Sequence, residues 1–584
     1  MLQENEDTIV ESKKVAEIFN DYFANVASSI GFDDRIFSTQ KAIEKHENHP
    51  SVLKIKGKFG NSNTHFSFKE ISSECIKSKL KNINIRKATG FDNIPGKILR
   101  IAHDPLSGPF SSLINTCIKQ NIFPNNMKCA EVSPIFKKAD NLSKSNYRPV
   151  SVLTVMSKVY ESVMNDQLTD YFSNLFEELL SAFRKSFSCQ SLLMKCIEDW
   201  KMSLDNNNII GTLFMDLSKA FDCLSHSLLV AKLHAYGLDI SACELIASYL
   251  SDRRQRVKLG TTRSDWTPLV KGVPQGSILG PLLFNIFLND MFYFMERCIL
   301  YNYADDNSMS HAAKTLHEVK SSLQHDGEIA IKWFSDNGMQ ANPEKFQFMV
   351  ISRSDPGIQE IVLPGNIIIK SETHVKLLGV LIDQQLNFTA HVSGLCKKAA
   401  KQLNALSRIS GYIDTNSRHI IYKSFIASNF NYCPIVWHFC GKRNTDKLEK
   451  MQERALRIIL KDYSSTYEEL LDTACTSPLV VNRLRNILCE VFRSVKHMNP
   501  KYVCDMFSIN RTKYSTRNPL KLVQSMKHTT TYGLRTFSYA GARLWNSSKI
   551  LDGANDLNDI SLNDFKSRAR GWNGPAPDDM HCFI

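Results

Sequence analysis

The chain has 584 residues and a mass of 66.4 kDa, which is long enough for several domains. Hydrophobic residues make up 43% and charged residues 22% of the sequence, a balance that excludes an intrinsically disordered chain. The longest apolar run, residues 278–288, is interrupted by Asn285 and is too short to span a bilayer, so we expect no membrane protein. The 15 cysteines follow no regular spacing, which indicates reduced thiols rather than a disulfide framework.

The net charge is +13, from 72 Lys and Arg against 59 Asp and Glu. Most of this surplus lies between His391 and Lys461, where 13 basic residues stand against 4 acidic ones. A concentrated basic segment favours nucleic acid as a partner.

In chain order, the first chemically informative segment follows a stretch of helical periodicity in residues 1–80. A strand-like run ends in Lys137-Lys138, and Arg148 follows across a loop. These cations can bind a triphosphate. Arg148 can form a bidentate pair with two phosphate oxygens, and a lysine can act as a point charge. A plain exposed basic hairpin explains the same residues equally well.

Two further segments bring carboxylates to the ends of strands. The apolar run from Ile209 delivers Asp216, and the run from Cys298 reaches Asp305-Asp306 and then turns polar, which predicts a β-hairpin with both acids at its tip. Adjacent aspartates repel each other, so the pair is either a solvated turn or a metal site. A third acid on a separate strand favours a site for two divalent ions, as used in phosphoryl transfer.

The remaining segments carry weaker signals. A short basic run with Arg253 and Arg254 fits a phosphate backbone or a solvated loop. Residues 274–277, Pro-Gln-Gly-Ser, form a glycine-containing turn before an apolar helix. Gly276 permits a close backbone approach to a base pair and Gln275 can hydrogen-bond nucleotide or template edges, while a plain helix-initiating turn explains the same residues. In residues 447–461 apolar positions line one helix face, and a second stripe is cationic, which fits either a duplex backbone or a solvated face. This stripe includes Lys450, Arg454 and Arg457.

Three ordered blocks together resemble the core motifs of reverse transcriptases. They are Asp216 with Phe221, residues 273–281 (Val-Pro-Gln-Gly-Ser-Ile-Leu-Gly-Pro) and residues 303–306 (Tyr-Ala-Asp-Asp). The flanking sequence, from about residue 10 to about residue 570, resembles the non-LTR (LINE-type) retrotransposons and within them the jockey-like elements. No endonuclease-like sequence precedes these blocks, so we expect a chain without that domain.

The resemblance implies a role for each matching residue. Asp216, Asp305 and Asp306 would hold two Mg²⁺ ions, with Mn²⁺ as the alternative, and Asp222 would orient neighbouring groups. Phe221 would exclude ribonucleotides, Lys345 would protonate the leaving pyrophosphate, and Arg184 would hold a template phosphate within a block that departs from the family pattern. Binding of the incoming nucleotide would fall to Lys137, Lys138, Arg148, Gln275 and Gly276. From the basic run and the cationic stripe alone, we expect Arg253, Arg254, Lys450, Arg454 and Arg457 to bind nucleic acid.

The fold implied is α+β, a right-handed palm-fingers-thumb polymerase with a helical N-terminal extension and a mostly helical thumb and C-terminal region. We expect five segments: a helical linker at 1–80, a fingers extension at 81–125, fingers and palm at 126–385, a basic helical thumb at 386–475, and a C-terminal region at 476–584 without an assigned role.

The function implied is that of an RNA-directed DNA polymerase of a mobile element, serving target-primed retrotransposition. Its partners would be an RNA template, a DNA primer or target and dNTPs, with an RNA-binding protein of the same element as a further candidate. The nucleus is the expected location, with the cytoplasm as a second compartment. Two alternatives stay open: a catalytically inactive RNA-binding remnant, and an RNA-dependent RNA polymerase, against which Phe221 argues.

Overall fold

A computed structural model describes residues 2–4, 7–25, 38–60, 65–218, 220–510, 520–551, 556–576 and 580. Parts of the predicted N-terminal linker and C-terminal region lie outside these ranges. The chain divides into two compact units, each built from three segments. Unit 1 comprises Met1–Phe183, Asp216–Met295 and Glu328–Glu344, and unit 2 comprises Arg184–Met215, Glu296–Gly327 and Lys345–Ile584. Strand β5 (Ile209–Ser218) and helix α12 (Leu316–Asp336) run through both units.

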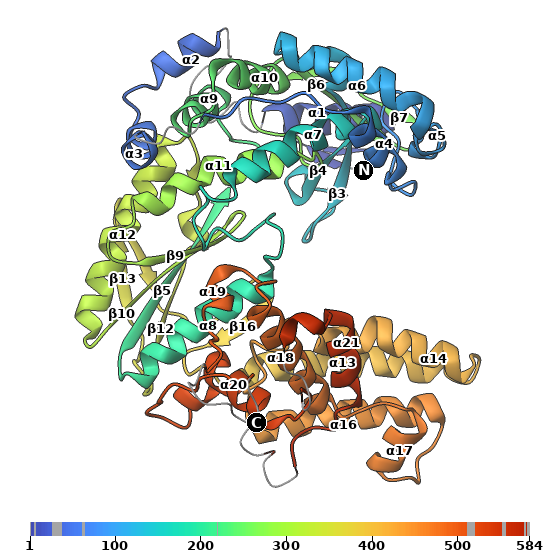
Figure 1. Ribbon diagram of the computed structural model, residues 1–584, viewed down its shortest axis with the longest axis vertical. Helices are drawn as coiled ribbons and strands as arrows, with labels where there is room; N and C mark the ends of the chain where they lie inside the picture. Colours follow the sequence, from blue (N-terminus) through green and yellow to red (C-terminus); the bar gives the residue numbers. More distant parts are fainter. Residues whose placement is uncertain are drawn as a thin grey trace. The chain divides into compact units, whose positions relative to one another are not determined.

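Unit 1 combines helices with a five-stranded sheet of order β4-β3-β6-β7, in which β8 also pairs with β6 (Figure 1). Strand β3 pairs antiparallel with β4 and parallel with β6. The strands of the unit are β1 (Leu2–Glu4), β2 (Asp7–Ile9), β3 (Cys129–Phe136), β4 (Tyr147–Leu153), β6 (Arg253–Leu259), β7 (Thr262–Arg263), β8 (Thr267–Leu269) and β11 (Gln340–Ala341). Its helices are α1 (Ser12–Asn25), α2 (Thr39–Lys45), α3 (Pro50–Phe59), α4 (Ser73–Lys81), α5 (Gly96–Ile101), α6 (His103–Gln120), α7 (Val155–Phe172), α9 (His226–Ala235), α10 (Ile240–Leu250) and α11 (Gly280–Asn289).

The N-terminal helix α1 belongs to the core of unit 1. Its apolar face, with Phe19 and Phe23, packs with Val132 of β3 and Val257 of β6 in one buried cluster. The helical period predicted for residues 1–80 is therefore confirmed for α1 to α4, while the short hairpin β1–β2 was not predicted.

Unit 2 contains the strands β9 (Ile299–Tyr303), β10 (Asp306–Ala313), β12 (Gln347–Ile351), β13 (Glu360–Leu363), β14 (Ile367–Lys370), β15 (His374–Leu377) and β16 (Val380–Asp383). Its helices are α8 (Cys189–Asp205), α13 (Thr389–Ile409), α14 (Thr415–Ile421), α15 (Ala427–Phe430), α16 (Lys442–Leu460), α17 (Tyr467–Thr473), α18 (Leu479–Val495), α19 (Lys501–Cys504), α20 (Phe537–Ser547) and α21 (Leu562–Gly571). In its main sheet β5 lies between β10 and β12, and β10 pairs with β9.

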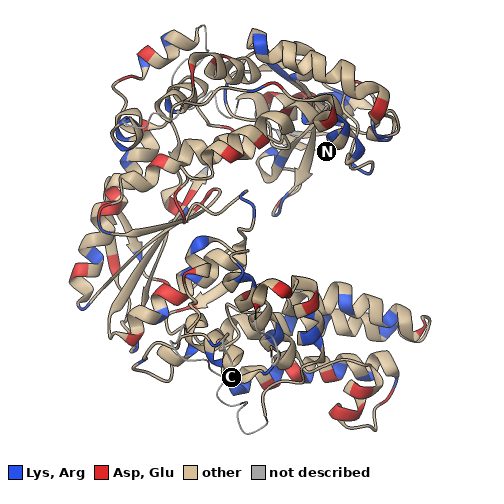
Figure 2. Ribbon diagram, in the orientation of Figure 1, with Lys and Arg blue, Asp and Glu red and all other residues tan. Residues whose placement is uncertain are grey.

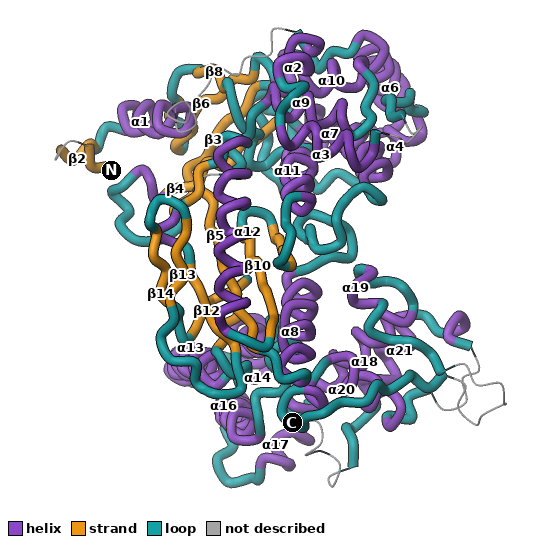
Figure 3. The backbone as a smooth tube through the Cα atoms, turned by 90° about the vertical axis from the view of Figure 1, so that its left-hand side faces the viewer, coloured by secondary structure: helices purple, strands orange, loops and turns teal. Residues whose placement is uncertain are grey.

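Helices cover both faces of this sheet. Helix α12 runs alongside the strands (Figure 3), and a side chain at Gly211 of β5 would collide with Val319 and Leu323 of that helix. On the other face, the indole nitrogen of Trp200 in α8 donates to the hydroxyl oxygen of Ser310 in β10 at 3.1 Å. The mixed helix and sheet content confirms the α+β class. None of the helices within the described ranges is long and apolar enough to cross a bilayer.

Candidate active site

The hairpin of β9 and β10 presents two adjacent carboxylates to solvent. Tyr303 pairs with Asp306, which leaves Ala304 and Asp305 as a two-residue turn, and both aspartates are exposed. Ala304 has a φ of +58°, a backbone conformation that residues other than glycine adopt at an energetic cost. The predicted hairpin with acids at its tip is confirmed.

Two buried asparagines hold this turn in place. The side-chain nitrogen of Asn302 donates to the carbonyl oxygen of Ala304 and to Oδ1 of Asn307, both at 2.8 Å. The side-chain nitrogen of Asn307 donates to the carbonyl oxygen of Asp305 at 3.3 Å. These contacts fix the backbone that carries the acids, and the sequence pattern gave no sign of them.

Asp216 lies near the end of strand β5, as predicted, and its side chain is half-buried. Its carbonyl oxygen accepts a hydrogen bond from the backbone nitrogen of Asn342 at 3.2 Å, next to the pairing of β5 with β11. Side chains alternate along a strand, so Asp216 shares a face of β5 with Thr212.

The donor chemistry of the three aspartates fits Mg²⁺, which prefers carboxylate oxygens. Within the described ranges, no three His, Cys, Asp or Glu side chains are grouped so that they alone could hold a metal ion. Mg²⁺ in polymerase sites is held by one or two carboxylates together with substrate phosphates and water, rather than by an all-protein cage. The residues therefore suit a site that the substrate completes.

The cationic hairpin predicted before residue 150 is confirmed as β3–β4. Ile135 lies opposite Arg148, and the backbone nitrogen of Lys137 donates to the carbonyl oxygen of Asn146 at 2.8 Å, which continues the register. Opposed residues and residues two apart share one face of a hairpin, so Lys137 and Arg148 are on the same face. Lys138 lies in the bend that follows, and all three cations are exposed.

Comparison with known proteins adds the decisive observation. Residues 135–382 match the family of reverse transcriptases (RNA-dependent DNA polymerases), and this range holds all three ordered motifs. The chain contains a reverse transcriptase domain. The resemblance seen in the motifs is thereby confirmed.

The curated proteins that this chain resembles include polymerases of mobile elements. The chain is 25% identical to the probable RNA-directed DNA polymerase from transposon BS of Drosophila melanogaster, over 67% of this chain and 45% of the relative. It is 26% identical to the probable enzyme from transposon X-element, over 64% and 42%, and 23% identical to that from mobile element jockey, over 67% and 44%, both of the same species. The chain spans less than half the length of these curated relatives.

In this reverse transcriptase domain, Phe221 is half-buried and stacks on Phe284 of α11, with ring centroids 4.1 Å apart and an interplanar angle of 19°. Phe183 meets the Phe221 ring edge-on at 6.0 Å. The aromatic ring assigned to sugar discrimination is thus held by packing, and part of it stays accessible.

The Pro-Gln-Gly-Ser turn is connected to the acid next to this ring. The side-chain nitrogen of Gln275 donates to Oδ1 of Asp222 at 2.9 Å, in agreement with the orienting role predicted for Asp222. The carbonyl oxygen of Gln275 accepts from the backbone nitrogen of Ser151 in β4 at 2.7 Å. Gly276 has a φ of +127°, and a Cβ there would lie 2.5 Å from the carbonyl oxygen of Ser151. Gly276 therefore packs closely on strand β4, and its predicted approach to a base pair stays a prediction.

Glu161, which no sequence pattern marked as functional, supports this turn. Glu161 of α7 is fully buried, and its Oε2 accepts from the backbone nitrogens of Ile278 at 2.7 Å and Leu279 at 3.2 Å. Ser157 donates to its other oxygen at 3.0 Å. Burial raises the pKa of Glu161, whereas the nearby positive charge of Arg253 and these hydrogen bonds lower it. Glu161 thus caps the start of α11 and fixes the Pro-Gln-Gly-Ser turn.

The prediction that Arg253 contacts nucleic acid is wrong. Its side chain is only 1% exposed, and its Nη1 donates to the carbonyl oxygen of Tyr249 at 2.9 Å. The basic run is strand β6 rather than a loop, and alternation turns Arg253 inward while Arg254 stays exposed.

The other predicted basic residues are accessible. Arg184 is half-buried with its guanidinium 4.1 Å from the centroid of the Phe187 ring, and Lys345 is exposed in a short 3₁₀ turn. On α16, Lys450 and Arg454 are exposed, and Arg454 donates to the side-chain oxygen of Asn404 in α13 at 2.5 Å. Figure 2 marks the Lys and Arg positions along these helices.

Arg457 departs from the predicted cationic stripe on α16. It is half-buried, and its guanidinium forms an ion pair with Glu453 at 2.8 Å. The stripe that faces solvent with net positive charge is therefore shorter than the sequence pattern predicted.

Proposed function

We propose that this chain acts as an RNA-directed DNA polymerase that extends a primer 3′-hydroxyl with dNTPs. The observation that carries the proposal is the exposed, braced Asp305-Asp306 turn inside a matched reverse transcriptase domain. The fold supports an assignment of β3–β4 to the fingers, of the sheet around β5, β9 and β10 to the palm, and of α13 to α16 to the thumb.

Asp216 and Asp305 would hold two Mg²⁺ ions, with Asp306 assisting. In support, β5 and β10 are neighbours in one sheet, and the hydroxyl oxygens of Thr212 and Ser310 are 3.0 Å apart. Asp216 and Asp306 each lie four residues from that pair along their own strands, so antiparallel strands would bring the acids to adjoining positions. Ions bound there would lower the pKa of the primer hydroxyl and stabilise the leaving pyrophosphate.

Binding of the incoming dNTP would fall to the β3–β4 hairpin and to the turn before α11. Arg148 and Lys137 share one hairpin face and would bind the triphosphate, with Lys138 as a further cation. Phe221, held by its stack on Phe284, would exclude a 2′-hydroxyl. Gln275 and Gly276 would line the nucleotide side of the site, in the geometry that Glu161 and Ser151 maintain.

Further residues would donate a proton to the leaving group or contact the nucleic acid. Lys345 would protonate the pyrophosphate as it leaves. Arg184, Arg254, Lys450 and Arg454 would contact phosphates of template or primer, since their side chains are accessible.

The relatives' origin in mobile elements supports a role in target-primed retrotransposition. The template would be RNA, the primer a DNA 3′ end at the target site, and an RNA-binding protein of the same element a further partner. Extension of a chromosomal DNA 3′ end would require the active protein to be in the nucleus.

Primer extension on poly(rA)/oligo(dT) with Mg²⁺ tests this function, with dTTP and UTP supplied separately. We expect extension with dTTP alone, and none by an Asp305→Asn variant. Extension with UTP would identify an RNA polymerase instead. Salt-dependent RNA binding without extension would identify an inactive RNA-binding remnant.

A further inference from the structure

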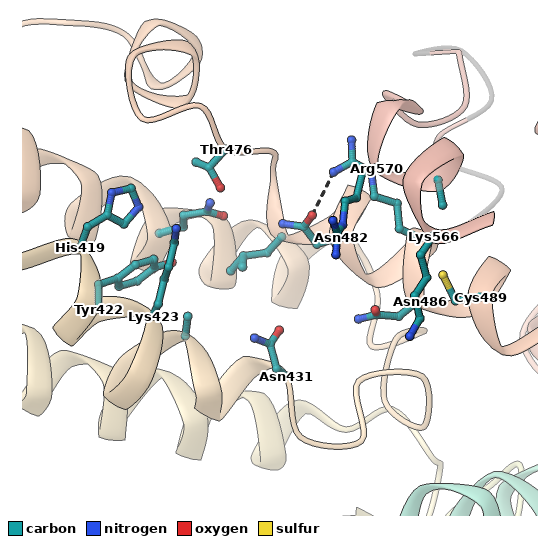
Figure 4. Close-up of a pocket in the computed structure, with 15 residues that line it drawn as sticks. His419, Tyr422, Lys423, Asn431, Thr476, Asn482, Asn486, Cys489, Lys566 and Arg570 are labelled. Carbon is teal, nitrogen blue, oxygen red and sulfur yellow. Dashed lines mark hydrogen bonds between the residues drawn. The ribbon is translucent and has the colours of Figure 1, made fainter. Parts of the chain in front are cut away.

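Unit 2 contains a cavity of about 570 Å³, away from the catalytic hairpin, that the proposed function does not use. Its walls come from α14, the π-helical turn Tyr422–Ile426, α16, α18 and α21. In Figure 4, His419 and Lys423 lie on one side, Lys566 and Arg570 on the other, and Asn482 between them. Segments from the predicted thumb and from the C-terminal region thus form one cavity.

The charge of this lining is one-sided. Lys423, Arg485, Lys566 and Arg570 all line the cavity, and none of its lining residues is an aspartate or glutamate. Among the residues that the structure describes, these four cations form no ion pair. A cavity whose described lining carries four cations and no carboxylate is suited to an anionic ligand.

Arg485 is fixed in this cavity by neutral groups. Its Nε and Nη2 donate to the carbonyl oxygen of Trp572 at 2.9 and 2.6 Å. Its Nη1 donates to Ser477 Oγ at 2.9 Å and to Asn482 Oδ1 at 3.2 Å. Partial burial lowers the pKa of Arg485, and none of these acceptors carries a negative charge. The guanidinium is therefore oriented while its charge is left for a ligand to neutralise.

Two further features point to a ligand that is a nucleotide. The wall with Lys423 is a π-helical turn, an irregularity that occurs frequently at functional sites. Asn431 and Asn486 also line the cavity, and their amides pair a donor with an acceptor as base edges do. The amides of Gln452 and Asn482 are hydrogen-bonded to Ser477, Tyr467 and Arg485 and form fixed walls. The volume lies within the range of small-ligand sites.

We propose that this cavity binds one unpaired nucleotide of a nucleic-acid strand, with its phosphodiester against Lys566, Arg570 and Lys423. The proposal rests on the proposed function only in that nucleic acid is the partner. Lys423, Lys566 and Arg570 are exposed, so the cavity opens to solvent and a strand can continue out of it. The C-terminal region would thereby hold a strand at a second point outside the catalytic site.

The test is fluorescence anisotropy with a short unstructured RNA and a DNA of the same sequence, using a Lys566→Ala/Arg570→Ala variant. Binding should weaken at least about tenfold, and the salt slope should fall by about 0.7, because the cavity holds one phosphate and each neutralised phosphate of a single strand contributes about that much. Arg568→Ala is the matched control, since Arg568 is exposed on the same helix and does not line the cavity. An Asn486→Asp variant, which adds a negative charge to the lining, should weaken binding as well, and Asn486→Gln should not.

Equal losses in the double variant and in Arg568→Ala, or no loss in either, would overturn the proposal, as would stronger competition by oligoglutamate than by the oligonucleotides. The RNA and DNA arms identify which strand supplies the phosphodiester. An Asp305→Asn variant should bind like the unmodified protein, so a failure of polymerase activity would leave this result intact.

Discussion

Asn302 and Asn307 are joined by a hydrogen bond of 2.8 Å across the hairpin that carries Asp305 and Asp306. The same Asn302 nitrogen binds the carbonyl oxygen of Ala304, whose backbone is in the left-handed region. We predict that Asn302→Ala lowers stability by about 1–3 kcal/mol, because buried acceptors lose their donor. It should also reduce kcat of primer extension more than it raises KM for dNTP.

Ser308→Ala serves as the control for that variant. Ser308 is buried in the same hairpin, and among the described residues its hydroxyl makes a single long hydrogen bond, of 3.5 Å to the carbonyl oxygen of Tyr301. Chemical denaturation and steady-state kinetics measure both effects. Similar kinetics for the two variants would show that the asparagine brace does not position the acids.

Phe221→Val should admit ribonucleotides. The smaller side chain removes the ring that would meet a 2′-hydroxyl, so the preference for dTTP over UTP should fall at least about tenfold. The ratio of kcat/KM values for the two substrates measures it. Phe287→Leu is the control, because Phe287 lies on the same helix α11 and its ring packs edge-on against Trp333. A loss of selectivity of the same size in that variant would reject the assignment.

Lys137 and Lys138 should differ in their effects on dNTP binding. Since Lys137 shares the hairpin face of Arg148, Lys137→Ala and Arg148→Ala should each raise KM for dNTP several-fold, and Lys138→Ala should raise it less. Titration of dTTP in primer extension gives the KM of each variant and so checks their predicted order. A larger effect at Lys138 would mean that the opposite face of the hairpin meets the triphosphate.

His391 makes the stability of unit 2 depend on pH. Burial, with a contribution from Lys376, lowers its pKa to about 4, and its Nδ1 accepts from the backbone nitrogen of Leu381 at 3.3 Å. The unfolded chain protonates this ring near pH 6.5 while the folded chain keeps it neutral. The stabilising contribution is therefore complete above pH 6.5 and is lost as the pH falls toward 4.

Denaturation curves between pH 4 and 7 test this dependence. The free energy of unfolding of a His391→Asn variant should change less over this range than that of the unmodified protein. His374→Asn, at an exposed position of the neighbouring hairpin, should keep the original profile. Parallel profiles for all three proteins would contradict the assignment to His391.

The sequence predicted those parts of the site whose signal is local. Asp216 on its strand, the acids at the hairpin tip and the Lys137 hairpin all follow from apolar runs that end in polar residues. Glu161 had no such signal, because the backbone nitrogen of Ile278 that it binds is 117 residues away. Arg253 was misassigned because its inward direction depends on the pairing of β6 with β3 and β8.

The domain boundaries also depend on contacts between residues far apart in the sequence. The five predicted segments follow the chain in order, whereas the two compact units each gather three separated segments. Long-range packing of this kind has no local pattern, and the predicted boundaries stay predictions. The cavity between α14, α18 and α21 likewise depends on residues far apart in sequence.

In the proposed function, Asp216 and Asp305 both hold the ions used in nucleotide addition. Single-turnover primer extension on a preformed primer–template complex measures their contribution in Asp216→Asn, Asp305→Asn and Asp222→Asn variants. The first two should lose about a thousandfold or more in rate, since the metals supply several kcal/mol of transition-state stabilisation, with binding of the primer–template unchanged. Asp222→Asn should lose far less, because Asp222 orients Gln275. Near-normal rates in either of the first two variants would show that the substituted carboxylate does not hold these ions.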